Sequence, residues 1–275
     1  MILIMKKYSI ILIAFLLLVF TSIITYNYHH QEDAIFRGIP LTRNYEYKLK
    51  APFKEIFLNT SDGSELNGLY FCNDSHKGVV LFLHGRGGNL SSWGSRANIF
   101  LKNGYDILII DYRGFGKSSS GFKEEWFLED AQIAYKYLQS IYDEKKIIIY
   151  GQSLGSSTAT HLASKNSPKM LILESPFYSM TAAASHTKPF LPEIIVSFIL
   201  KYKLPTFEWI KDVKSPIYIF HGSNDTTIPL EQAQQLYVEI NNNTHSEIIV
   251  LQGLNHNDVY KNKIYRVKLQ EILNN

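Results

Sequence analysis

The sequence predicts an α/β fold with a mostly parallel central sheet and helices on both faces. Short apolar or β-branched runs, each closed by Gly, Asp or His, alternate with longer segments of helical spacing. Six of the eight runs are almost continuously apolar, which is typical of parallel strands buried on both faces. The predicted strands are 55–58, 66–72, 79–83, 107–110, 147–150, 170–173, 217–220 and 248–251.

The connections support this fold class. The first two strands are expected to pair as a hairpin around the turn at 61–64, and the other connections are long enough for crossover helices. Apolar residues recur every three to four positions in 127–141, which indicates a helix lying on the sheet. The other predicted helices are 92–102, 154–164, 230–241 and 258–273. The segment 180–211 breaks the alternation and contains a mostly apolar run, so we expect a short helical cap there.

Composition narrows the class of protein. The chain has 275 residues, of which 45% are hydrophobic and 19% charged, and this excludes a disordered, collagenous or coiled-coil protein. The net charge of +3 is spread along the chain, so no nucleic-acid partner is expected. Cys72 is the only cysteine, which excludes an intrachain disulfide and a CxxC zinc site.

The N-terminus carries a predicted membrane segment. Residues 9–26 contain no charge and are long enough, though barely, to cross a hydrocarbon core that takes about 20 helical residues. We expect an uncleaved signal anchor; a cleaved signal peptide or a buried core helix are the alternatives. Lys6 and Lys7 favour a cytoplasmic N-terminus, with the rest of the chain on the non-cytoplasmic side. The predicted units are a cytoplasmic stretch 1–8, the anchor 9–26, a tether 27–52 and one domain 53–275 that includes the cap.

A nucleophile is predicted at Ser153. The range 151–155 reads GQSLG, follows a predicted strand and opens a predicted helix. A serine on such a sharp strand-to-helix turn has an exposed hydroxyl, and the flanking glycines avoid collisions with nearby backbone. The alternative is a chance match to the GxSxG pattern in a flexible turn.

A base and an acid follow the serine in the chain. Asp225 comes just after the strand 217–220 and His256 just after the strand 248–251, so both lie at carboxyl ends of strands, where open α/β sheets keep their sites. We expect His256 to act as the base and Asp225 to hold its ring in the useful tautomer. Asp258 is the rival acid, but its position indicates the cap of the last helix.

The glycine-rich range 84–89 is expected to help form an oxyanion hole. The amide of Leu154, directly after the nucleophile, and the amide of Arg86 are the predicted donors. A dinucleotide loop would need a third glycine where Leu90 stands, and a phosphate loop ending at 116–118 would need one where Asp111 stands. We therefore expect no cofactor and no metal.

Taken together, these motifs resemble the α/β-hydrolase fold. The ranges 84–89 (HGRGGN), 111–118 (DYRGFGKS), 151–155 and 174–177 (ESPF) are similar to the Bem46-like group of membrane-associated serine hydrolases, and the resemblance covers about 54–275. It implies the same catalytic residues and oxyanion donors, and a bracing role for Arg113. The sequence departs from the group's pattern at Ser156, where a second glycine is common, and at Gly121, which comes later than usual.

The expected function is hydrolysis of an ester, thioester or related acyl bond through a Ser-His-Asp triad and an acyl-enzyme. The substrate is expected to be a small-molecule or lipid-like acyl compound, because an apolar cap beside a membrane segment can roof an apolar pocket. A serine peptidase, an acyltransferase and a non-catalytic, membrane-tethered binding module are the alternatives.

Overall fold

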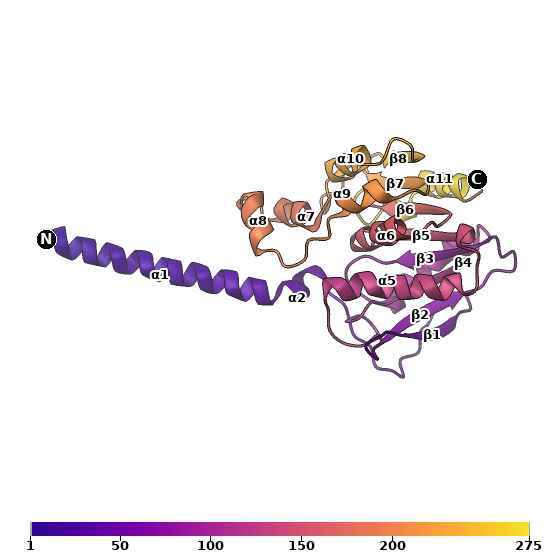
Figure 1. The fold of residues 1–275 in the computed structure, drawn as a ribbon, viewed down its shortest axis with the longest axis horizontal. Coiled ribbons are helices and arrows are strands. Elements are labelled where there is room, and N and C mark those ends of the chain that lie inside the picture. The colour runs from indigo at the N-terminus through magenta and orange to yellow at the C-terminus, as the bar shows by residue number, and fades with distance from the viewer. Residues whose placement is uncertain (1, 275) are drawn as a thin grey trace.

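The computed structural model describes residues 2–274 and contains one eight-stranded sheet (Figure 1). The strand order is β1-β2-β4-β3-β5-β6-β7-β8. The strands are β1 (Lys54–Asn59), β2 (Glu65–Phe71), β3 (Val79–Leu83), β4 (Asp106–Ile110), β5 (Ile147–Gln152), β6 (Met170–Glu174), β7 (Ile217–Gly222) and β8 (Ser246–Leu251).

The pairing of the strands agrees with the sequence pattern. β1 and β2 form an antiparallel hairpin that closes at the Asn59–Glu65 pair, and Gly63 supplies a positive φ of 82° in its turn. β2 also pairs antiparallel with β4, while β3 to β8 are mutually parallel. The α/β class with a mostly parallel sheet is therefore confirmed.

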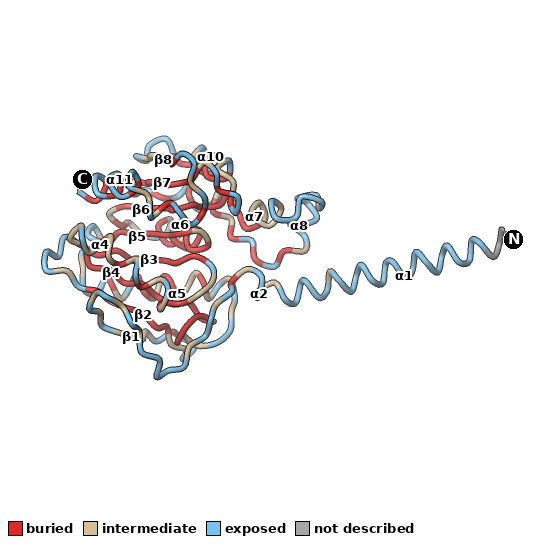
Figure 2. The backbone as a smooth tube through the Cα atoms, turned by 180° about the vertical axis from the view of Figure 1, so that it is seen from behind, coloured by how far each residue is buried: buried red, intermediate tan, exposed pale blue. Residues whose placement is uncertain are grey.

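Helices cover both faces of the sheet and create two hydrophobic cores. Alternate residues along β3 enter different cores: Val79 and Leu81 belong to the core that includes residues of α5, α6 and α10, whereas Val80 and Phe82 belong to the core that includes residues of α4 and α11. In Figure 2 the strands are mostly buried and the loops around them mostly exposed. The helices of the domain are α3 (Leu90–Trp93), α4 (Ala97–Leu101), α5 (Glu124–Gln139), α6 (Leu154–Lys165), α7 (Met180–Thr187), α8 (Glu193–Ile199), α9 (Thr206–Trp209), α10 (Leu230–Val238) and α11 (Lys263–Asn274).

Two helix predictions need correction. The predicted helix 92–102 is two short helices joined by a 3-10 turn at Gly94–Arg96. A Cβ at Gly94 would lie 2.4 Å from the Leu49 side chain, so the residue at this turn must be small. Asp258 does not cap the last helix: α11 begins after Asn262, whose Oδ1 accepts the amide of Ile264 at 2.7 Å.

Helix α1 (Ile2–His29) extends away from the domain (Figure 1). An 18-residue window within its stretch Met5–His29 has a mean hydropathy of 2.5, and none of the residues of that window is buried in the protein. The helix includes the predicted anchor 9–26 and is long and apolar enough to cross a bilayer. It fits a single-pass membrane anchor, and its exposure excludes the core helix that the sequence left open.

The segment 27–52, predicted as a tether, packs on the domain for part of its length. Helix α2 (Gln31–Ile35) leads to Phe36, which is buried in the core. Two isolated parallel bridges, Gly38 with Gly88 and Pro40 with Gly116, then attach this segment to the glycine-rich loop and to the loop after β4. The segment therefore braces the loop that is expected to hold the oxyanion.

Candidate active site

Ser153 lies on a strained turn between β5 and α6. Its φ of 50° and ψ of −117° are outside the regions that residues with a Cβ normally occupy. Glycines permit the turn: a Cβ at Gly151 would lie 2.5 Å from the Cβ of Ala159, and one at Gly155 would lie 2.1 Å from the carbonyl oxygen of Leu83. The turn has the geometry of a nucleophile elbow, as the sequence predicts.

The fold brings the three predicted side chains together from the carboxyl ends of β5, β7 and β8. Nε2 of His256 lies 3.0 Å from Oγ of Ser153, and Nδ1 of His256 lies 2.6 Å from Oδ2 of Asp225. With the proton on Nδ1, the ring donates to the carboxylate and accepts from the serine hydroxyl. This arrangement can remove a proton from Ser153.

Asp225 is held in place from several directions. Its Oδ1 accepts the amides of Thr227 and Ile228, each at 2.9 Å. Burial alone would raise the pKa of Asp225, but hydrogen bonding to His221 and His256 holds that pKa well below its usual range. Asp225 therefore stays ionised at neutral pH.

The rival acid lies outside this arrangement. The side chain of Asp258 is 53% exposed and lies 3.4 Å from Nζ of Lys261. The only carboxylate in contact with the His256 ring, among the described residues, is that of Asp225.

Two amides are free beside the nucleophile. Among residues 2–274, neither the amide of Arg86 nor that of Leu154 donates a hydrogen bond to another group of the chain. The loop that carries Arg86 approaches closely, because a Cβ at Gly85 would lie 3.3 Å from the Cβ of Ser153. Both residues line the same cavity as Ser153. Two unpaired donors at this place are suited to hold an oxyanion.

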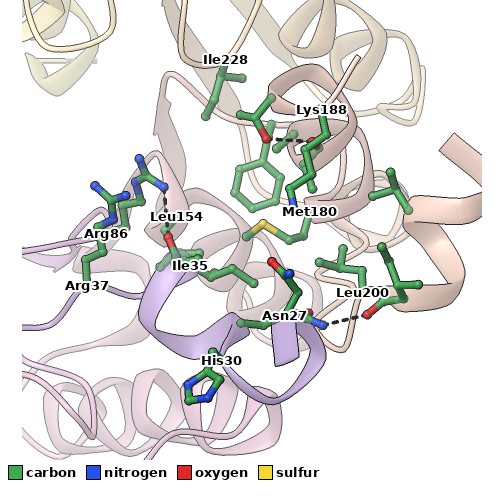
Figure 3. Close-up of a pocket in the computed structure, with 18 of the residues that line it drawn as sticks. Asn27, His30, Ile35, Arg37, Arg86, Leu154, Met180, Lys188, Leu200 and Ile228 are labelled. Carbon is green, nitrogen blue, oxygen red and sulfur yellow. Dashed lines mark hydrogen bonds between the residues drawn. The ribbon is translucent and has the colours of Figure 1, made fainter. Parts of the chain in front are cut away.

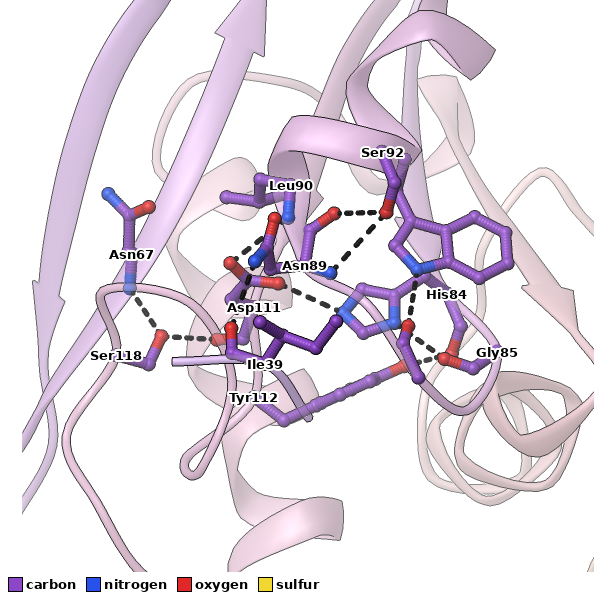
Figure 4. A network of polar contacts seen from close by, with 12 residues as sticks. Ile39, Asn67, His84, Gly85, Asn89, Leu90, Ser92, Asp111, Tyr112 and Ser118 are labelled. Carbon is purple, nitrogen blue, oxygen red and sulfur yellow. Dashed lines mark hydrogen bonds and ion pairs between the residues drawn. The ribbon is translucent and has the colours of Figure 1, made fainter. Parts of the chain in front are cut away.

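A buried polar network supports the oxyanion loop (Figure 4). Nδ1 of His84 donates to the carbonyl of Gly85 at 2.7 Å, and Nε2 lies 3.3 Å from Oδ1 of Asp111. The other oxygen of Asp111 accepts the amide of Leu90 at 3.2 Å. Burial raises the pKa of Asp111, against the opposing effects of His84 and of the amide of Leu90. His84 thus buttresses the turn that follows β3.

Arg113 braces a second set of loops away from the reacting atoms. Its guanidinium binds Asp130 at 2.8 Å, Asp62 at 2.8 Å and Glu129 at 2.9 Å. Burial raises the pKa of Asp130 to about 6, against the opposing effect of its bonds from Arg113. The predicted bracing role of Arg113 agrees with these contacts.

A cavity of about 400 Å³ opens above Ser153 (Figure 3). Apolar side chains of α6, α7 and α8 line it. The wall also includes residues of α1, of α2 and of the position between these helices, which the sequence did not point to. The missed residues are Ile24, Asn27, Tyr28, His30, Gln31, Ala34 and Ile35.

The charged groups that line the cavity all have the same sign. Arg37, Arg86 and Lys188 line it, and no Asp or Glu belongs to the described lining. None of the three side chains forms an ion pair within residues 2–274. Partial burial lowers the pKa of Arg86, and so does the neighbouring charge of Arg37. The cavity is thus apolar inside and cationic at its rim.

Comparison with known proteins places this site in a family. The profile of the family described as "Serine aminopeptidase, S33" matches residues 74–209. An uncharacterized protein of Mycobacterium tuberculosis is 30% identical over 209 residues, which cover 74% of this chain and 73% of that protein. The chain belongs to the α/β-hydrolase family.

Two further relatives of this α/β-hydrolase confirm the predicted resemblance to the Bem46-like group. Protein bem46 of Schizosaccharomyces pombe is 29% identical over 193 residues, covering 67% of this chain and 64% of bem46. Lysophosphatidylserine lipase ABHD12 of Danio rerio is 29% identical over 185 residues, covering 58% of this chain but only 46% of ABHD12.

Solved structures agree on the fold. An esterase of Pyrococcus furiosus superimposes with a TM-score of 0.70 at 22% identity, covering 87% of this chain and 97% of the esterase. The family makes the chain an α/β-hydrolase enzyme with a lipase among its relatives, and the solved structures of an esterase and of a thioesterase share its fold.

Proposed function

We propose that the protein is a membrane-anchored serine hydrolase in which Ser153, His256 and Asp225 form the catalytic triad. The observation that carries this proposal is the continuous chain of contacts, 3.0 Å from Ser153 to His256 and 2.6 Å from His256 to Asp225. The same chain order and roles recur in α/β-hydrolases.

The mechanism follows from the geometry. Oγ of Ser153 bonds to the acyl carbon while Nε2 of His256 takes its proton, and the carbonyl electron pair moves to oxygen. The amides of Arg86 and Leu154 hold that oxyanion, and each such donor contributes about 2.7–4 kcal/mol in comparable enzymes. When this tetrahedral intermediate collapses, the bond to the leaving group breaks, and the leaving group takes the proton from His256. Water then adds to the acyl-enzyme with the same base, releasing the acid and restoring Ser153.

We propose that the substrate is an ester of an anionic amphiphile with a long acyl chain. The apolar interior of the cavity suits the chain, and the unpaired cations Arg37, Arg86 and Lys188 suit a phosphate or carboxylate group. The name of the relative ABHD12, a lysophosphatidylserine lipase, supports this class. Aminopeptidase activity is disfavoured, since an N-terminal ammonium needs a carboxylate and the described lining provides none.

We also propose an orientation in the membrane. Lys6 and Lys7 precede the apolar part of α1, and the positive-inside rule places that end in the cytoplasm. The domain then lies on the non-cytoplasmic side.

A fluorophosphonate probe tests the nucleophile. We expect the probe to label the wild type covalently and not to label Ser153→Ala. Ser197→Ala, which removes a serine of the cap, is the control and should still be labelled. Folded wild type that stays unlabelled would refute the enzymatic proposal and favour a binding module. Labelled Ser153→Ala would assign another nucleophile.

A panel of chromogenic esters tests the substrate class. Chain length and head-group charge are varied separately, and we expect the highest kcat/KM for long chains with an anionic head. Arg86→Ala should remove the preference for charge and leave the preference for length. Equal rates on anionic and neutral heads would refute the charge assignment. Adding glycerol as acceptor separates hydrolysis from acyl transfer.

A further inference from the structure

Helix α8 of the cap is apolar on nearly all sides, although one of its faces is exposed. Val196 is buried, and Ile199 lines the cavity together with Leu200, the residue after the helix. On the outer face Ile194 is 60% exposed and Phe198 is 76% exposed. A helix that is apolar all round is normally buried in protein or in lipid.

The outer face of α8 continues into the turn before it. Phe190, three residues before the helix, is 78% exposed, and Ile195 is also exposed. We call Phe190, Ile194, Ile195 and Phe198 the cap patch. Such a grouping of large apolar side chains on a surface usually marks a contact with another apolar partner.

Helix α8, which carries most of the cap patch, lies next to the membrane helix. Ile24 and Tyr28 of α1 line the same cavity as Val196 and Ile199 of α8. Gln31, just after α1, donates to the carbonyl of Ile199 at 2.7 Å and accepts the amide of Lys201 at 2.8 Å. In Figures 1 and 2, α8 projects from the domain on the side from which α1 leaves it.

We propose that the cap patch inserts into the surface of the bilayer that α1 crosses, as a second membrane contact. Helix α8 shares a cavity with α1 and projects on the side from which α1 leaves the domain (Figure 1), so the bilayer that α1 crosses is in reach of α8. Lys188, exposed at the end of α7, is placed to extend toward lipid phosphates. Glu193, the first residue of α8, is also exposed and can remain in the polar head-group layer of the bilayer.

This contact would give the cavity a route to the membrane. The cavity is bounded by both α1 and α8, so an amphiphile could enter between them without its acyl chain crossing water. This consequence rests on the proposed function, whereas the membrane contact rests on the position and exposure of the patch.

The contact is tested with the full chain in nanodiscs that contain nitroxide-labelled lipid. Cys72, the only cysteine, is changed to serine, and an environment-sensitive fluorophore is attached to Ile194→Cys or to Ile141→Cys. These two isoleucines are 60% and 51% exposed, but Ile141 follows the end of α5 that lies away from α1 (Figure 1). We expect a blue shift and loss of fluorescence at position 194 and neither at position 141.

Equal quenching at the two positions would overturn the proposal. The proposal would also be overturned if the fluorescence of the label at position 194 changed in the presence of a second labelled copy of the chain and not in the presence of lipid. Neither readout needs activity, so the result holds even if Ser153 proves unreactive. In a second measurement, Phe198→Ser should lower the rate on an ester embedded in a bilayer and leave the rate on a water-soluble acetate ester unchanged; equal losses on both would also overturn it.

Discussion

Gly155→Ala tests the close approach of α6 to β3. The added methyl would lie 2.1 Å from the carbonyl oxygen of Leu83 and 2.6 Å from that of His84. Both are backbone atoms that cannot rotate aside, so α6 must move by about 1 Å, and Ser153 precedes it directly. A misplacement of that size costs about 10²-fold in rate, or about 2.7 kcal/mol of transition-state stabilisation. Overpacking also costs about 1–3 kcal/mol of folding free energy.

The assay compares kcat on a soluble ester and the melting temperature of Gly155→Ala with those of Gly68→Ala. Gly68 lies in β2, and a methyl there would lie 3.2 Å from side-chain atoms of Ile56 and Leu108 and 3.4 Å from the carbonyl oxygen of Ile109, so no backbone atom is closer than ordinary contact. We expect Gly155→Ala to melt lower by about 2–4 °C for each kcal/mol lost, and Gly68→Ala to keep its rate. If Gly155→Ala keeps both its rate and its melting temperature, the glycine is not needed for the steric reason given.

Asp225→Asn should lower kcat by up to about 10⁴-fold, because the amide favours the wrong tautomer of His256, while Asp258→Asn should have little effect; the reverse order in a kinetic assay would reassign the acid. The folded pKa of Asp225 is depressed, so its contribution to stability is present above its unfolded pKa of about 4 and is lost as the pH falls further. Urea unfolding should therefore show the advantage of the wild type over Asp225→Asn narrowing below about pH 4; a constant advantage would contradict this. Asp111→Asn should lower kcat by up to about 10²-fold by loosening the loop that carries Arg86, and an unchanged kcat would show that the network supports only folding.

The sheet could be predicted because six of its eight strands are nearly continuous apolar runs with no rival period. The observed β3 coincides with the predicted 79–83, and the other strands differ by one or two residues at their ends. The three residues proposed for the triad could be singled out because each lies within five residues of the end of a strand, so the parallel sheet brings them to one edge.

The cavity wall could not be predicted in the same way. Residues 31–41 have no helical or strand period, and their path depends on contacts such as Phe36 in the core and Gly38 beside Gly88. The sequence also did not predict the cationic rim of the cavity, because Arg37 and Arg86 are far apart in the chain. Only the folded chain places them on one cavity.

The position of Gln31 has a consequence for shedding from the membrane. A protease that cuts between His30 and Gln31 would release a domain that keeps both hydrogen bonds between the Gln31 side chain and the cap. The same cut would remove Ile24, Asn27 and Tyr28 and leave one side of the cavity open to water. The released form should therefore still cleave short soluble esters but bind long acyl chains poorly, so that a single cleavage would change both the location and the selectivity of the enzyme.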